Sequence, residues 1–421
     1  MNKYVKYGIY FLIAGIVVNH LFRLVFHSIP VDKLIMGSDP VGYYQYLPTF
    51  FLEDWDKFNY LPWSISFGET KWLSVFTCGV AILWSPFFLL GHFFTLFLGY
   101  EANGWGNIYF GFILVAALFY VYVGLVFLYK FLLAYFDSKN ALRTTILLFI
   151  ATNVFYYTTI LGTGMAHAYS FSLISVFLYY VQQFYRQPSL KLVILFSLPL
   201  SMAVLIRPTN VIAYLFVLLY DVRTLGELKE RFLYWVKNYK YLLAVVLTGF
   251  VVFIPQMLYW HEVTGKFIYY SYQNFGFSNW LTPKFGVVLF GKFNGWITYT
   301  PLVVFALYGL YCLLRKKALH SIATLVVLIC AVYINASWWV PTFSAALGQR
   351  AMIDFLPFIA IPLAWTLQKI DLSSRKWKIF FLVILVVIIY FNVQFSFRYD
   401  PVMWWEPPFS WAKFFKYVWF G

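Results

Sequence analysis

The chain of 421 residues is 62% hydrophobic and 24% aromatic, and only 11% of its residues are charged. Soluble domains carry about 25% charged residues, so the composition excludes a soluble domain of this length. Apolar runs long enough to cross a hydrocarbon core of ~30 Å recur from end to end, and they are far longer than barrel strands. We therefore predict an all-α polytopic membrane protein with a single transmembrane domain over residues 1–421.

The net charge of +15 is spread over short connections between apolar runs, which argues against a nucleic-acid partner. Cytoplasmic loops are enriched in Lys and Arg, so we predict that these connections share the inner face and that the N-terminus lies inside. The basic connections are Lys3/Lys6, Lys130/Lys139/Arg143, Arg186/Lys191, Arg223 to Lys240, Arg315 to Lys317 and Lys369 to Lys378.

The first apolar run, 6–26, lacks a small-residue cleavage site and is predicted to be an uncleaved helix. Two more runs, 74–98 and 107–130, precede the next basic connection. Three crossings would place that connection outside, so one run must return to the side from which it entered or lie on the surface. We assign this behaviour to the run 74–98, because Pro86 and Gly91 are expected to break it, it carries His92, and it follows a segment rich in Trp and Tyr.

This parity predicts about eleven spanning helices and an outer C-terminus. It also places four irregular aromatic-rich segments on the outer face, where we expect them to pack on the membrane surface and cover a cavity. The predicted spans are 6–26, 107–134, 143–160, 167–185, 190–206, 209–222, 239–260, 299–314, 319–336, 350–367 and 379–395. The outer segments are the first loop 27–106 with amphipathic or re-entrant helices, the second loop 261–298, the loop 337–349 and the tail 396–421.

Asp39 stands just beyond the first predicted span, before Pro40 and an aromatic helix that contains Tyr43 and Tyr44. A carboxylate at the lipid interface is suited to act as a general base. Asp before Pro is also a favourable helix N-cap. The two interpretations are compatible, because a capping Asp keeps one oxygen free.

Arg207 lies between two apolar stretches, where an unpaired charge would cost about 2.5–3.5 kcal/mol. We expect an anion beside it, either a lipid phosphate or an internal carboxylate. His167, at the tip of two short helices, could bind a sugar or phosphate, or bond to a neighbouring carbonyl.

Arg350 and Asp354 are four residues apart, which on an α-helix predicts an internal ion pair; phosphate or acceptor binding by Arg350 is the alternative. Lys292 is a similar loop candidate, or a solvated lysine. The three cysteines have no metal-ligand spacing and are expected to fill the core without a disulfide. Two Trp pairs, Trp338-Trp339 and Trp404-Trp405, could stack on sugars but fit interface anchors better.

Several short motifs together resemble the GT-C glycosyltransferases, in the branch that includes protein O-mannosyltransferases and the aminoarabinose transferase of lipid A, with most similarity to bacterial members. The resemblance covers most of the chain. The motifs are Ser38-Asp39-Pro40 with Tyr43-Tyr44, Leu83 to Leu89, Met165 to Ser170, Ile206 to Asn210, Tyr270-Ser271-Tyr272, Asn294-Gly295-Trp296 and Gly348-Gln349-Arg350.

The resemblance implies transfer of a sugar from a polyprenyl-phosphate carrier to a lipid, glycan or protein acceptor at the outer face of a bacterial plasma membrane. It implies that Asp39 is the catalytic base. The implied substrate- and phosphate-binding residues are Arg207, Arg350, Lys292, His167, Tyr43, Tyr44 and Gln349.

Many family members carry a second acidic residue where this chain has Pro40, and another where it has His167. A carboxylate-bound metal usually needs several oxygen ligands, so no metal or cofactor is predicted, although a divalent cation is not excluded. A polytopic transporter or flippase of a lipid-linked or anionic substrate is the alternative function, since membrane Arg and His residues and broken helices also occur there.

Overall fold

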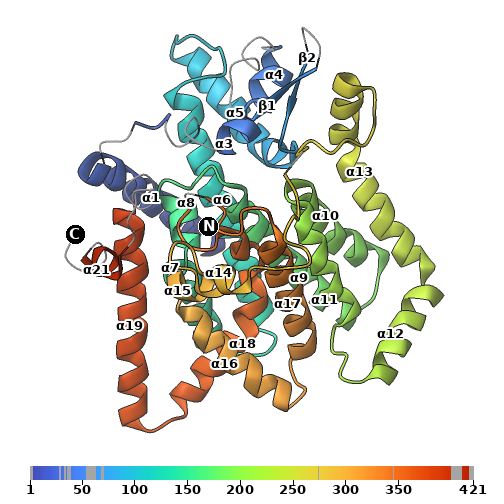
Figure 1. Ribbon diagram of the computed structural model, residues 1–421, viewed down its shortest axis with the longest axis vertical. Helices are drawn as coiled ribbons and strands as arrows, with labels where there is room; N and C mark the ends of the chain where they lie inside the picture. The colour runs from blue at the N-terminus through green and yellow to red at the C-terminus, as the bar shows by residue number, and fades with distance from the viewer. Residues whose placement is uncertain are drawn as a thin grey trace.

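The computed structural model describes residues 3–27, 30–32, 35, 39–53, 63–67, 71–273, 275–344, 346–399 and 410–416. Ser38, Trp404 and Trp405 lie outside these ranges. The chain is 74% helical, which confirms the predicted all-α class (Figure 1).

The elements before residue 166 include the short helices and the strands at the top of Figure 1. They are α1 (Lys3–Leu21), the π-helix η1 (Phe22–His27), α3 (Asp39–Tyr44), α4 (Tyr46–Leu52), β1 (Ser64–Phe67), β2 (Lys71–Ser74), α5 (Gly79–Phe97), α6 (Asn107–Leu132), α7 (Ser138–Ile150) and α8 (Val154–Thr159). The two strands form an antiparallel hairpin in which Ser64 pairs with Ser74 and Phe67 with Lys71.

The later elements form most of the helical bundle. They are α9 (Ala166–Arg186), α10 (Leu190–Ile206), the 3₁₀-helix η3 (Pro208–Ala213), α11 (Tyr214–Leu218), α12 (Leu225–Lys237), α13 (Tyr239–Thr264), α14 (Phe285–Phe290), α15 (Trp296–Tyr299), α16 (Leu302–Arg315), α17 (Ser321–Ser337), the 3₁₀-helix η4 (Arg350–Ile359), α18 (Ala360–Asp371), α19 (Arg375–Arg398) and α21 (Trp411–Phe415).

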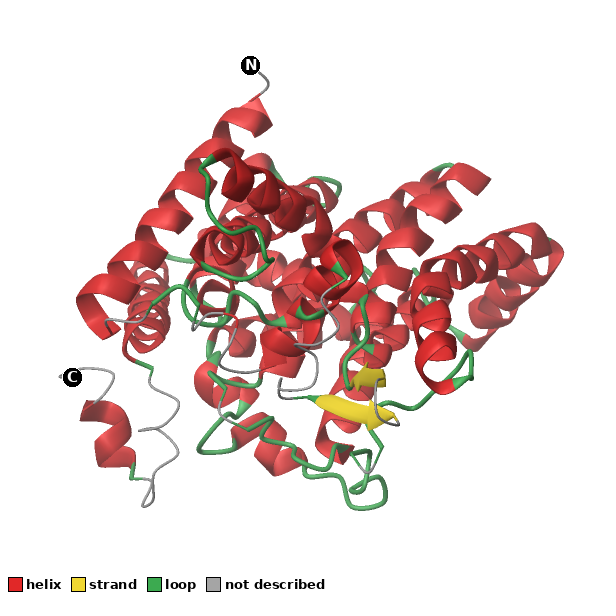
Figure 2. Ribbon diagram, turned by 90° about the horizontal axis from the view of Figure 1, so that it is seen from above, coloured by secondary structure: helices red, strands yellow, loops and turns green. Residues whose placement is uncertain are grey.

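Six described helical stretches are long and apolar enough to cross a membrane, and four shorter apolar stretches lie close to predicted spans. The six are Lys3–Leu24, Gly79–Phe97, Asn107–Leu132, Tyr239–Thr264, Arg350–Asp371 and Arg375–Arg398. The helices do not run parallel to one another: α1 lies across the direction of α19 in Figure 1, and Figure 2 shows helices pointing in several directions. The count of eleven spans stays a prediction.

The expectation that Pro86 and Gly91 break the run 74–98 is wrong, because α5 continues through both residues. Pro86 has no N–H for the carbonyl of Ile82, one turn earlier. The Ser85 hydroxyl donates to that carbonyl instead, at 2.8 Å. Gly91 permits close packing on α6, since a Cβ there would lie 3.2 Å from the Cα of Tyr109. The helix is long and apolar enough to be a span itself.

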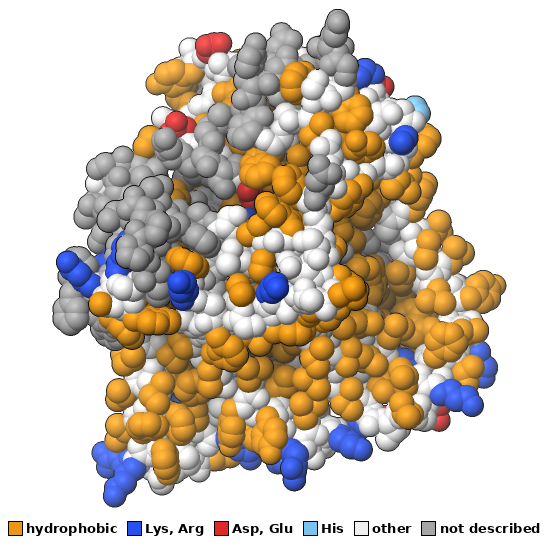
Figure 3. Space-filling view, in the orientation of Figure 1, with side chains coloured by type: hydrophobic (Ala, Val, Ile, Leu, Met, Phe, Trp, Pro, Cys, Tyr) orange, Lys and Arg blue, Asp and Glu red, His pale blue; other side chains and the backbone are white. Residues whose placement is uncertain are grey.

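Figure 3 shows Lys and Arg side chains along the lower edge, below a broad band of hydrophobic side chains, and others at mid-height and near the top. In Figure 1 the connection between α18 and α19 and the amphipathic helix α12 lie at the lower end, whereas the N-terminus lies at mid-height. The two lower connections agree with the Lys and Arg bias, and one inner face for all six basic connections stays a prediction.

Two hydrophobic clusters make the interior. The larger one joins α6–α11 with α16–α19 and η4, and the smaller one joins α3 and α4 with α5, the outer parts of α6 and α13, and the hairpin. The polar residues singled out above lie at the ends of helices where the clusters meet, which are the start of α3, the start of α9, the end of α10 and the start of η4.

Candidate functional site

Asp39 is the first residue of α3, followed by Pro40, and its carboxylate faces η4. The Nη2 atom of Arg350 lies 2.9 Å from Oδ2 of Asp39. Both side chains are mostly buried, with 14% of Arg350 and 15% of Asp39 exposed. Close contact between Pro40 and Gly164 places α3 against the start of α9, because a Cβ on Gly164 would lie 2.7 Å from the Cβ of Pro40.

The segment before Arg350 is held by α8 and its N-terminal flank. The Asn153 side-chain amide donates to the carbonyl of Leu347 at 3.1 Å, and the N–H of Leu347 donates to the Tyr157 hydroxyl at 3.1 Å. Gly348 then takes a φ of +64°, which favours glycine. Gln349 is fully buried and donates from Nε2 to the carbonyl of Pro341 at 2.9 Å. These bonds fix the direction from which Arg350 reaches Asp39.

Asp354 forms a second charged group with His167 and Arg207. Its Oδ1 lies 2.9 Å from Nδ1 of His167, and its Oδ2 lies 3.3 Å from Nε of Arg207. Asp354 and His167 are almost completely buried, whereas 19% of the Arg207 side chain is exposed. The internal-carboxylate partner considered for Arg207 is therefore present.

His167 lies between Asp354 and Arg207. Its Nδ1 is 2.9 Å from Oδ1 of Asp354, and an acceptor carboxylate there favours the proton on Nδ1. Nη1 of Arg207 lies 3.2 Å from Nδ1 and 3.0 Å from Nε2, so it is nearly equidistant from the two ring nitrogens. His167 thus bridges a guanidinium and a carboxylate.

The ion pair predicted between Arg350 and Asp354 is wrong. Residues 350–359 form a 3₁₀-helix. A 3₁₀-helix has about three residues per turn, so residues four apart point in directions about 120° apart. Arg350 consequently turns to Asp39, and Asp354 turns to His167 and Arg207.

Tyr43 and Tyr272 are within electrostatic range of both charged groups. The charges of Asp39, Arg207 and Arg350 each act on the pKa of the two phenols. Burial raises the pKa of Tyr43 well above its usual value and that of Tyr272 to about 12. Both phenols therefore keep their protons at physiological pH and can donate hydrogen bonds.

Tyr44 and Lys292 have other surroundings. Tyr44 is fully buried, and its hydroxyl donates to the carbonyl of Gly104 at 2.6 Å, so it packs the first loop. The Lys292 ammonium lies 5.2 Å from the ring centroid of Phe293. Trp338 packs edge-on against Tyr272 at 5.9 Å, and Trp339 stacks on Phe275 at 4.8 Å.

In the described part of the chain, no three His, Cys, Asp or Glu side chains form a group suited to a metal ion. Asp39 and Asp354 each face an arginine, which competes with a cation for the same oxygens. The three cysteines are free, and Cys78 is buried.

Solved structures with a similar fold include those of the oligosaccharyltransferase AglB from Archaeoglobus fulgidus. Its complex with an inhibitory peptide and a dolichol-phosphate matches with a TM-score of 0.56 and 12% identity, over 99% of this chain and 58% of that one. The form tethered to an acceptor peptide containing the NVT sequon matches with a TM-score of 0.54 and 13% identity, over 94% and 55%.

The chain shares its fold with these oligosaccharyltransferase structures, as the predicted GT-C-like architecture requires. The chain spans just over half the length of these solved chains. No protein-family model and no curated protein matches the sequence.

Sequence reasoning found four of the charged or titratable groups at this end of the GT-C fold: Asp39, His167, Arg207 and Arg350. It assigned Asp354 the wrong partner and did not single out Tyr272 as a neighbour of the site. The Tyr270-Ser271-Tyr272 motif was the available signal for Tyr272. Nothing local in the sequence pointed to Asn153.

Proposed function

We propose that the protein transfers a sugar from a polyprenyl-phosphate carrier to an acceptor hydroxyl at the outer face of the membrane, with inversion at the anomeric carbon. The observation that carries the proposal is that η4 brings together two charged groups on a GT-C fold. Arg350 pairs with Asp39, and Asp354 pairs with His167 and Arg207.

Asp39 is the proposed base. Arg350 contacts Oδ2, which leaves Oδ1 for the proton of the acceptor hydroxyl. As that oxygen bonds to the anomeric carbon, the bond from this carbon to the phosphate oxygen breaks, and its electron pair stays on the phosphate. Neighbouring chain segments already hold the Asp39–Arg350 ion pair in place, so the two side chains need not rearrange during the reaction.

Arg207 is the proposed partner of the leaving phosphate. Asp354 and His167 hold one side of its guanidinium, and the exposed fraction can meet a phosphate oxygen. A dolichol-phosphate is present in one of the similar AglB structures, which supports a lipid-borne phosphate as the ligand class. Such a donor needs no nucleotide site.

The test is transfer by the purified protein in proteoliposomes that contain a panel of polyprenyl-phosphate sugars and a cell-envelope extract as acceptor. Released polyprenyl phosphate is measured. We expect Asp39→Asn to lower the initial rate by about 10²–10⁴-fold, the usual contribution of a general base. Glu53→Gln is the matched control, because Glu53 is an exposed carboxylate at the end of α4.

Two outcomes would overturn the proposal. One is an unchanged rate in a folded Asp39→Asn protein. The other is movement of a lipid-linked sugar across the bilayer without release of polyprenyl phosphate, which would favour the transporter or flippase alternative.

A further inference from the structure

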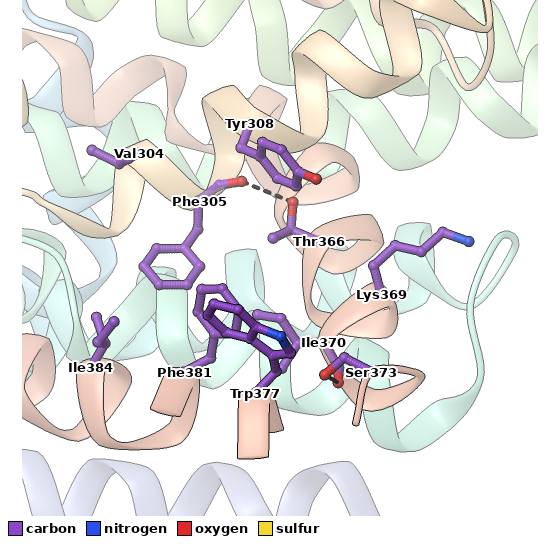
Figure 4. A pocket seen from close by; sticks show the side chains of 10 residues that line it. All are labelled: Val304, Phe305, Tyr308, Thr366, Lys369, Ile370, Ser373, Trp377, Phe381 and Ile384. Carbon is purple, nitrogen blue, oxygen red and sulfur yellow. Dashed lines mark hydrogen bonds between the residues drawn. The ribbon is translucent and has the colours of Figure 1, made fainter. Parts of the chain in front are cut away.

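A groove lies between α16, α18 and the first half of α19, away from the candidate site. Its volume is about 530 Å³, within the range of ligand-binding pockets. Each helix contributes one stripe of side chains (Figure 4). The ten lining residues are Val304, Phe305, Tyr308, Thr366, Lys369, Ile370, Ser373, Trp377, Phe381 and Ile384.

Most of the groove wall is apolar. Phe381 stacks on Trp377 at 5.9 Å and meets Phe305 edge-on at 6.0 Å. The Thr366 hydroxyl donates to the carbonyl of Phe305 at 2.8 Å, so its polar group is already satisfied by the protein. A groove of this kind in a membrane-embedded bundle is suited to hydrocarbon.

One end of the groove is cationic. Figure 4 shows Val304 and Ile384 at one end and Lys369 with Ser373 at the other. The ammonium groups of Lys369 and Lys316 lie 5.4 Å and 5.6 Å from the ring centroid of Trp365. These lysines belong to basic connections at the end of the molecule where Lys and Arg gather (Figure 3).

The nearby carboxylate does not cancel this charge. Asp371 lies at the end of α18, and its Oδ2 is 2.8 Å from Nη2 of Arg143. A bidentate pair with Arg143 occupies both oxygens, since Nη1 donates to Oδ1 at 2.9 Å. Asp371 therefore does not neutralise Lys369, the lysine that lines the groove.

We propose that this groove binds an anionic phospholipid, with an acyl chain along Phe305, Phe381 and Ile384 and the headgroup phosphate at Lys369 and Ser373. Trp377 lies in the first turn of α19, four residues after Ser373, which suits the interface preference of tryptophan. From Trp377 to Ile384 the helix rises by ~10 Å, so the groove reaches from the headgroup level into the hydrocarbon.

The experiment is native mass spectrometry of the full-length protein with added phosphatidylglycerol or phosphatidylcholine. We expect tighter binding of phosphatidylglycerol, and a loss of about fivefold or more in Lys369→Glu, since each basic residue near a headgroup contributes about that factor. Lys376→Glu is the charge control, because Lys376 is exposed and does not line the groove.

A second pair of variants tests whether an acyl chain occupies the apolar part of the groove. Ile384→Trp should fill the groove and weaken binding, whereas Ile379→Trp, on the opposite face of α19, should not. Equal binding of the two lipids, equal effects of a variant and its control, or displacement of the lipid by soluble glycerol phosphate would overturn the proposal.

Discussion

Arg350 forms its ion pair with Asp39, although Asp354 lies only four residues away in the same helix. The pair links the start of α3 to the start of η4. The 3₁₀ geometry points Asp354 away from Arg350, and Asp354 pairs with His167 and Arg207 instead. Each arginine of the candidate site therefore has its own carboxylate, and one of these carboxylates, Asp39, is partly accessible.

Replacing Arg350 with Lys should impair transfer more than folding. Lysine keeps the positive charge but has no planar fork, so the Asp39 carboxylate would lose its fixed direction. We expect the rate of polyprenyl-phosphate release to fall about 10–100-fold with a small change in the thermal midpoint. Lys266→Arg is a control at an exposed position of the second outer loop. A rate equal to that of the wild type would show that the orientation of Asp39 is unimportant.

Replacing Asp354 with Asn should destabilise the protein. Breaking a buried pair costs about 3–5 kcal/mol, because the remaining Arg207 charge and His167 lose their partner. Asp371→Asn removes a more exposed pair, with Arg143, and should cost about 0–1 kcal/mol. The measurement is thermal unfolding in detergent, and similar shifts in the two variants would contradict the expected difference.

Gly164→Ala should move α3 away from α9. The added Cβ would lie 2.7 Å from Pro40, whose ring cannot rotate away. Because Asp39 precedes Pro40, we expect a loss of transfer of about 10²-fold, the effect of a displacement of ~1 Å at a reacting group.

Gly111→Ala is the control for this substitution. Its Cβ would meet no heavy atom within 4 Å, and alanine favours a helix interior by about 0.5–1 kcal/mol over glycine. Unchanged transfer in Gly164→Ala would mean that contact with Gly164 does not position Asp39.

We expect the folded protein to lose stability at alkaline pH as Tyr272 ionises. Its pKa is raised by burial from 10.0 in the unfolded chain to about 12 in the folded protein. The folded state thus favours the protonated phenol, and this stability is present below about pH 10 and is lost as pH rises towards 12. Thermal midpoints measured across this range should fall less steeply in Tyr272→Phe than in the wild type. Tyr100→Phe, at an exposed tyrosine, should follow the wild type; a slope unchanged by Tyr272→Phe would contradict the assignment.

Much of the helical pattern follows from the sequence, because the apolar runs are long and their ends are marked by charged or proline residues. The runs 107–134 and 190–206 appear as α6 and α10 with close bounds. The predicted run 143–160 is interrupted in the structure, where α7 ends at Ile150 and α8 begins at Val154. Continuity of α5 depends on a side-chain bond from Ser85 that periodicity does not encode.

The membrane class, the basic end of the molecule and the set Asp39, His167, Arg207 and Arg350 were determined by composition, charge placement and motif order. Which carboxylate meets which cation was decided by the tertiary structure. The four-residue spacing of Arg350 and Asp354 predicts neighbouring side chains only if the segment is an α-helix. In the structure this segment, η4, is a 3₁₀-helix. Contacts such as Arg350–Asp39 and Asp354–His167 join distant segments, and packing of α3, α9 and η4 creates them.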